Sequence, residues 1–165
     1  MNIGPALLSE FEHEMAGART CVERVPDDRL GWRPHPKSAT MGRLAAHLAE
    51  LAGFAERTLT TESFDMRPGG TALPALEAGS RAQILELFDR NVAAARAAIA
   101  ATRDAEWMEP WTLLANGQLV FRLPRVAVVR NSVLNHSIHH RAQLTVYLRL
   151  TGVAVPALYG PSADE

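Results

Sequence analysis

The segment Asn135-His136-Ser137-Ile138-His139-His140-Arg141-Ala142-Gln143-Leu144 holds three of the six histidines of the chain. It lies at the centre of a stretch, Arg130 to Thr151, whose spacing predicts one long amphipathic helix. Residues at steps of three and four share the inward face of this helix: Val129, Val133, His136, His140, Leu144 and Tyr147. Two histidines four residues apart can direct their imidazoles at one atom, which is how a helix offers two ligands to a metal. His139 lies one step off this face.

A third histidine occupies a similar position upstream. Thr40 is a suitable N-cap for a helix that reaches about Leu59, and its inward face carries Leu44, His47, Leu51 and Phe54. A lone histidine on such a face is more often a hydrogen-bonded core residue than a ligand. If this helix packs against the 130–151 helix, however, the three imidazoles of His47, His136 and His140 converge. Two interpretations stay open at this point: a metal site, or three hydrogen-bonded core histidines.

Two further helices are predicted by apolar stripes of helical period. The first spans about Pro5 to Val25, and the second about Ser80 to Thr102, with Ser80 as its N-cap. The last helix should begin near Pro124 and end at Thr151, where Gly152 is a natural C-cap. The tail that follows, 153–165, holds Pro and Gly residues and is expected to have no regular structure.

The two long connections complete the expected fold. Glu62 to Gly79 is about 18 residues long, enough to cross the end of a bundle and let the flanking helices run parallel. In Asp104 to Pro124, Asn116-Gly117 stands between two apolar runs, which is a strong hairpin signal. The sequence therefore predicts an all-α four-helix bundle, a single domain over residues 1–165, with a long crossover between helices two and three and a small hairpin between helices three and four.

Composition excludes several classes of function. A net charge of −1 with no basic run gives no reason to expect a nucleic-acid partner. No leader and no apolar run of about 18 residues are present, so we expect a cytoplasmic protein that spans no membrane. The single cysteine, Cys21, cannot form an intramolecular disulfide, and its helical surroundings indicate a buried structural thiol.

Three histidines with vacant positions are typical of a catalytic metal site, whereas structural zinc sites usually have four protein ligands. Imidazole suits Zn and Ni, and Fe or Mn stay open as alternatives. Ligating histidines need acceptors on their other ring nitrogen, and the candidates are Glu50, Asn135 and Gln143. No spacing nominates a general base, so no catalytic residue is predicted.

The chain resembles the DinB/YfiT-like superfamily. The resemblance rests on Leu44-Ala45-Ala46-His47-Leu48-Ala49-Glu50 together with the 135–144 segment, and it is supported by the loop Trp32–Ser38 and by Tyr147–Gly152. It implies a four-helix bundle in up-down-down-up order. It also implies that His47, His136 and His140 are the metal ligands, while His139 and Arg141 match flanking positions without being ligands.

The same resemblance implies function and assembly. Members are commonly homodimers that bind zinc, nickel or another divalent ion. They include S-transferases that use bacillithiol, mycothiol or glutathione, an isomerase, and metal-dependent hydrolases. We therefore expect one divalent transition metal, a small-molecule substrate and a low-molecular-weight thiol as cosubstrate.

Three functions are consistent with these expectations. The first is a metal-dependent transferase that activates the thiol for attack on an electrophile. The second is a hydrolase, which would cleave esters or amides without any thiol. The third is a non-catalytic metal-binding or stress-response protein whose ion stabilises the fold. That third function requires the vacant metal position to be blocked, for example by Tyr147, the hairpin or the tail.

Overall fold

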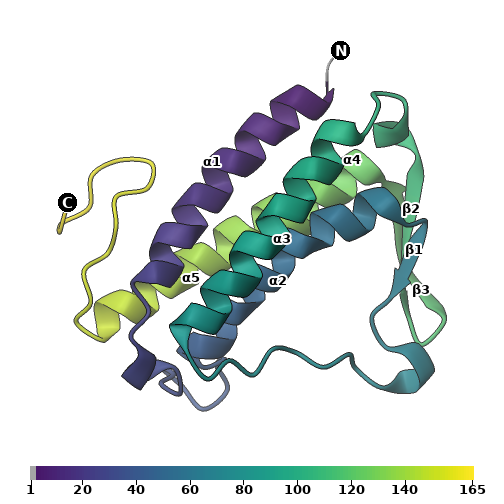
Figure 1. Cartoon of the computed structure of the whole chain (residues 1–165). Coiled ribbons are helices and arrows are strands. Elements are labelled where there is room, and N and C mark those ends of the chain that lie inside the picture. The colour runs from purple at the N-terminus through teal and green to yellow at the C-terminus, as the bar shows by residue number, and fades with distance from the viewer. Residues whose placement is uncertain (1–2) are drawn as a thin grey trace.

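The computed structural model describes residues 3–165, and the chain forms a mostly helical fold with a small sheet at one end (Figure 1). The helices are α1 (Ile3–Glu23), α2 (Met41–Thr60), α3 (Arg81–Ala101), α4 (Arg125–Val128) and α5 (His136–Leu150), and the strands are β1 (Ser63–Asp65), β2 (Pro110–Ala115) and β3 (Gln118–Pro124). Helix α2 packs against α3 and α5, and α1 packs against the same two helices. No helix within residues 3–165 is both long and apolar enough to cross a membrane.

Three of the predicted helix ends are confirmed by their caps, while the first helix runs from Ile3 to Glu23 instead of from Pro5 to Val25. Thr40 Oγ1 accepts a hydrogen bond from the Arg43 N–H at 3.2 Å, and Ser80 Oγ accepts one from the Gln83 N–H at 3.3 Å. These bonds satisfy backbone donors that the first turn of a helix leaves free. Gly152 has a φ of 75°, the left-handed conformation that closes a helix C-terminus.

The core lies between the four long helical segments. Its largest fully buried side chains include Phe11, Met15, Leu48, Phe88 and Leu144. Cys21 is also fully buried, as predicted. Trp32, expected to cover the end of the core, is half-buried there and meets the ring of Tyr147 edge-on, with centroids 5.5 Å apart.

The hairpin and the mostly helical fold are as predicted, but the all-α prediction did not account for a sheet of three strands. Asn116 and Gly117 have φ values of 53° and 73°, the pair of left-handed residues that a two-residue hairpin turn requires. Strand β2 pairs with β3 antiparallel and with β1 parallel. Strand β1 lies within the connection that the sequence predicted to be a loop, and Asp65 fastens it by accepting the backbone N–H groups of Asn116 and Gly117.

The last helix is interrupted, contrary to the prediction of one continuous α-helix. A π-helix, Val129–Asn135, separates α4 from α5. Its wider turns rotate the following residues relative to an uninterrupted α-helical period. The buried residues of α5 are consequently Ser137, Arg141, Leu144 and Leu148. His136 and His140 each precede one of these positions and are only half-buried.

The tail forms neither helix nor strand after Leu150, as predicted, yet it is held by specific contacts. Arg149 pairs with Asp164 at 2.6 Å, Arg24 pairs with Glu165, and the Tyr159 hydroxyl donates to Glu14 at 2.7 Å. Figure 1 shows the tail beside α1, at the end of the molecule away from the sheet.

Candidate metal centre

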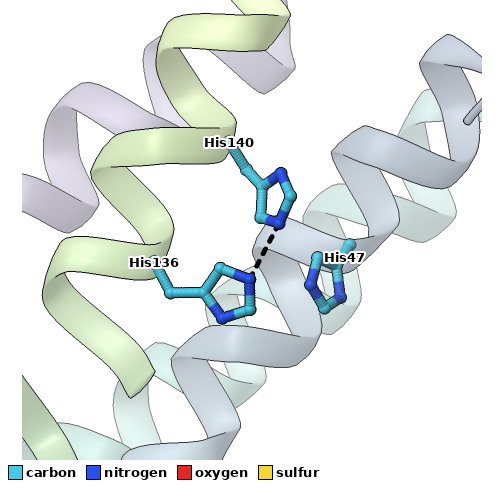
Figure 2. A group of neighbouring side chains, drawn as sticks. All are labelled: His47, His136 and His140. Carbon is cyan, nitrogen blue, oxygen red and sulfur yellow. Dashed lines mark hydrogen bonds between the residues drawn. The ribbon is translucent and has the colours of Figure 1, made fainter. Parts of the chain in front are cut away.

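Three histidines from two helices meet at the contact between α2 and α5. His47 projects from α2, and His136 and His140 project from α5 toward it (Figure 2). One ring nitrogen from each lies within 4.8 Å of the other two, and the Nε2 atoms of His136 and His140 are 2.9 Å apart. The π-helix before His136 sets the rotation of α5, and π-turns are frequent at functional sites.

Each imidazole is oriented by an acceptor at its other nitrogen. His47 Nδ1 donates to the Glu50 carboxylate at 3.3 Å, and His140 Nδ1 donates to Gln143 Oε1 at 2.7 Å. His136 hydrogen-bonds the backbone of Ser132. The sequence correctly proposed Glu50 and Gln143 for this role. Its third candidate is wrong, because the Asn135 amide bonds Asn131 instead.

These bonds decide what the cluster can hold. With Nδ1 of His47 engaged by Glu50 and Nδ1 of His140 engaged by Gln143, Nε2 is the nitrogen that each of these rings has left for a metal. The other ring nitrogen of His136 adds a third. In Figure 2 the Nε2 atoms of His136 and His140 share a hydrogen bond, and a divalent cation could replace the shared proton and bind all three rings at once. The donor set therefore fits a divalent transition metal, which His47, His136 and His140 could hold with positions left for another ligand.

Burial keeps two of the rings neutral. Burial lowers the pKa of His136 to about 4, neighbouring histidines lower it too, and only the bond to the Ser132 backbone opposes them. Burial likewise lowers the pKa of His140, against a hydrogen bond to Gln143. At neutral pH these imidazoles are unprotonated, the form that binds metals.

Glu50 is an orienting carboxylate rather than a proton acceptor. Burial raises its pKa, but hydrogen bonds from His47, from Arg43 and from the Leu76 amide outweigh burial and lower the pKa to about 2. Arg43 Nη2 lies 2.5 Å and the Leu76 nitrogen 2.9 Å from its oxygens. A carboxylate this acidic is a weak base at neutral pH, where a general base works best with a pKa near 7.

Open space adjoins the cluster. A cavity of about 660 Å³ is lined by His47 and Glu50, and a second of about 330 Å³ is lined by His47 and His136. Neither is lined by Tyr147, whose hydroxyl lies 3.3 Å from the Ala39 carbonyl. The hairpin supplies a wall through Leu113 rather than a plug over the histidines.

The flanking motif residues stay outside the cluster. His139 is exposed, with its ring centroid 4.9 Å from that of His140. Arg141 faces the opposite side of α5 and pairs with Glu14 at 2.8 Å. His13 and His35 are exposed as well, on α1 and in the loop before α2.

Fold and site together define a helical protein with a candidate metal centre shared by two helices. Residues 10–144 match the model of the DinB superfamily, and the chain belongs to that family. It is 23% identical over 158 residues to the uncharacterized protein YrdA of Bacillus subtilis (strain 168), covering 96% of this chain and 89% of YrdA.

Two solved structures share the fold. A DinB-like protein from Bacillus cereus ATCC 10987 superposes with a TM-score of 0.68 at 21% identity, covering 92% of this chain and 95% of that one. The DinB-like protein YjoA from Bacillus subtilis gives a TM-score of 0.72 at 15% identity, covering 94% and 99%. The expected family is confirmed by the family match, and the chain has a DinB-like fold.

Proposed function

We propose that this protein is a divalent-metal-dependent transferase that activates a low-molecular-weight thiol. The observation that carries the proposal is the convergence of three imidazole nitrogens, within 4.8 Å of one another, beside two cavities. Zinc or nickel are the ions we favour, because neutral imidazole suits both. The cavities provide room for a small molecule to reach the same point.

A divalent ion held by the three histidines would bind a thiol and favour its deprotonated form, as metal ions do with coordinating thiols. The residues of the chain would do the rest. Glu50 holds His47 in the tautomer that exposes Nε2, and Gln143 does the same for His140. Phe54, Phe64 and Leu113 line the smaller cavity with apolar surface and would exclude water from the reacting groups.

The two alternatives have less support. A hydrolase would use water activated at the same ion, and the carboxylate beside the triad, Glu50, is hydrogen-bonded to Arg43 and His47 and so is not positioned to assist that water as a base. A non-catalytic metal protein requires a blocked vacancy, whereas cavities adjoin both His47 and His136. We therefore keep transfer as the leading function and test hydrolysis beside it.

We also infer that residues 1–165 form one domain in which the helices follow the up-down-down-up order. Two contacts support this order. The Ile3 N–H donates to Asp104 just after α3, and the Arg81 side chain at the start of α3 donates to the Glu23 carbonyl at the end of α1. A homodimer is proposed from the family, and light scattering should give twice the mass of the chain.

Metal analysis tests the proposal first. Protein purified without a tag or chelator should contain about one equivalent of zinc or nickel by plasma mass spectrometry. His136→Ala should lose it, and His139→Ala, an exposed histidine on the same helix, should retain it. Wild-type protein that stays metal-free after incubation with either ion would rule out the metal centre.

A second measurement tests the thiol. The d–d absorption of the cobalt-substituted protein should change when bacillithiol, mycothiol or glutathione is added, and the change should be absent in His47→Ala. If no thiol alters the spectrum and esters are cleaved without thiol, the transferase is wrong and the hydrolase takes its place.

A further inference from the structure

The larger cavity beside His47 carries an unusual charge. Four arginines line it, against two glutamates: Arg43, Arg57, Arg67 and Arg90 with Glu50 and Glu56. The chain as a whole has a net charge of −1, so this positive excess is local. A cavity lined by one sign of charge concentrates ligands of the opposite sign.

Most of these arginines have no carboxylate of their own. Arg43 pairs with Glu50. Within residues 3–165, Arg57, Arg67 and Arg90 make no ion pair, and Arg57 instead stacks over the Phe64 ring at 4.1 Å from its centroid. They come from three separate segments: Arg57 from α2, Arg67 from the connection after β1, and Arg90 from α3. Their guanidinium groups are available to an anion that enters the cavity.

Arg43 adds a group whose bonding is incomplete. Its Nη2 donates to Glu50, whereas its Nη1 is buried and has no hydrogen-bond partner in the described part of the chain. Because Nη1 is covered by protein, Arg43 contributes positive charge to this end of the cavity rather than a hydrogen bond from Nη1.

Part of the lining is apolar. Phe54, Phe64 and Met66 line both cavities, and Leu113 lines the smaller one next to His136. Strand β1 supplies Phe64, and Asp65 fixes that strand to the hairpin turn. A ligand that fills this space can therefore contact histidines, apolar side chains and arginines.

We propose that the cavity binds an organic oxyanion, a small molecule whose carboxylate or phosphate is bound by Arg57, Arg67 and Arg90 while its apolar body lies against Phe54 and Phe64. Guanidinium groups bind both oxyanions through paired N–H donors. This anion site rests on the proposed function in one respect: the part of the ligand that reacts would have to reach the metal held by the histidines. The anion site itself needs no metal.

Calorimetric titration of metal-free and zinc-loaded protein tests the site with three probes: 3-phenylpropionate, phenyl phosphate and the uncharged 3-phenylpropanamide. In the metal-free protein at least one anion should bind about tenfold more tightly than the amide. Whichever of the two binds better identifies carboxylate or phosphate as the recognised group. Arg90→Gln and Arg57→Gln should each remove most of that preference.

Arg96→Gln is the matched control for Arg90→Gln. Arg96 is an exposed arginine that, like Arg90, lies on α3, but it pairs with Glu12 outside this cavity. The Arg96→Gln variant should bind the probes as the wild type does. Equal binding of the amide and both anions, or arginine variants that bind like the wild type, would overturn the anion site. Anion binding that depends on the arginines in a protein that takes up no metal would leave the site standing and remove only the metal-dependent function.

Discussion

His140 and Arg141 are neighbours on α5, yet they belong to two polar clusters of opposite character. His140 faces α2 and is half-buried, with its Nε2 2.9 Å from that of His136. Arg141 faces α1 and is buried, with a side chain only 4% exposed. The histidine cluster adjoins cavities of about 660 and 330 Å³, whereas the cavity beside Arg141 is only about 220 Å³ and is walled in part by the C-terminal tail.

The two clusters differ in whether their bonding is complete. Arg141 donates to the Glu14 carbonyl at 3.1 Å, to the Glu14 carboxylate at 2.8 Å and to the Tyr159 hydroxyl. Gly17 leaves room for this, since a Cβ there would lie 2.6 Å from Arg141 Nη1. The histidine cluster instead gathers three ring nitrogens within 4.8 Å, with a hydrogen bond between the Nε2 atoms of His136 and His140 and a nitrogen of His47 beside them. Donors and acceptors that all satisfy one another indicate a structural role, whereas three ring nitrogens gathered beside cavities suit a metal ion.

Arg141→Met should give the largest loss of stability. It leaves the Glu14 carboxylate buried without its partner, and breaking such a pair costs about 3–5 kcal/mol. Urea unfolding of the metal-free protein measures the cost. Arg149→Met is the control, because Arg149 lies on the same helix and pairs with Asp164 at the surface, where a pair contributes about 0–1 kcal/mol. Equal losses in the two variants would remove the distinction between the clusters.

Zinc binding should depend on the histidine cluster and not on the cluster around Arg141. At free zinc one hundred times the Kd, the free energy of unfolding should rise by about 2.7 kcal/mol, because the ion binds only the folded state. His140→Ala should lose this gain entirely, and Arg141→Met should keep it despite its lower starting stability. A gain that survives in His140→Ala would mean that zinc binds elsewhere.

Glu50→Gln should have an intermediate effect. Glu50 orients His47 through a hydrogen bond. Substituting a residue that orients a metal ligand typically lowers metal affinity by about 10–100-fold. The folded-state pKa of Glu50, about 2, is lower than its ordinary 4.5. Its ionised form therefore stabilises the protein above about pH 4.5, and that contribution is lost as the pH falls toward 2. Acid titration of the metal-free variant should show a smaller loss across this interval than the wild type does.

The sequence predicted most of the helical framework because its signals are local. Apolar spacing, the caps Thr40 and Ser80, and the Asn116-Gly117 turn all lie within the elements that they specify. The π-helix has no such signal, since its backbone pairing is compatible with the same residues as an α-helix. It shifted the expected face, so the histidines lie beside the buried stripe instead of on it. Strand β1 was missed because three residues are too few for a period, and its partner is distant in the sequence.

The candidate site was predictable to the same extent. The histidine spacing and the family resemblance predicted that His47, His136 and His140 lie together. Glu50 and Gln143 were predicted as their hydrogen-bond acceptors because each lies about one helical turn from a histidine. Ser132 was missed because its contribution is a backbone group. The cluster of Glu14, Arg141 and Tyr159 was not foreseen, since its members come from α1, α5 and the irregular tail. Only tertiary packing brings such residues together.

Tyr159→Phe should have the smallest effect and tests how the closed cluster is built. Tyr159 is 65% exposed, its ring centroid lies 4.9 Å from the Arg141 guanidinium carbon, and its hydroxyl hydrogen-bonds Glu14 and Arg141, so the substitution keeps the ring and removes only the hydroxyl. Glu14 and Arg141 still contact each other without it, so the loss should be about 1 kcal/mol. Burial raises the pKa of Tyr159, and so does its bond to Glu14. The neutral hydroxyl therefore stabilises the fold up to about pH 10, the ordinary tyrosine value, and wild-type stability should decline as the pH rises through the higher folded value. The variant should lack that decline. An identical alkaline profile in wild type and Tyr159→Phe would mean that the tail covers the cluster without completing it.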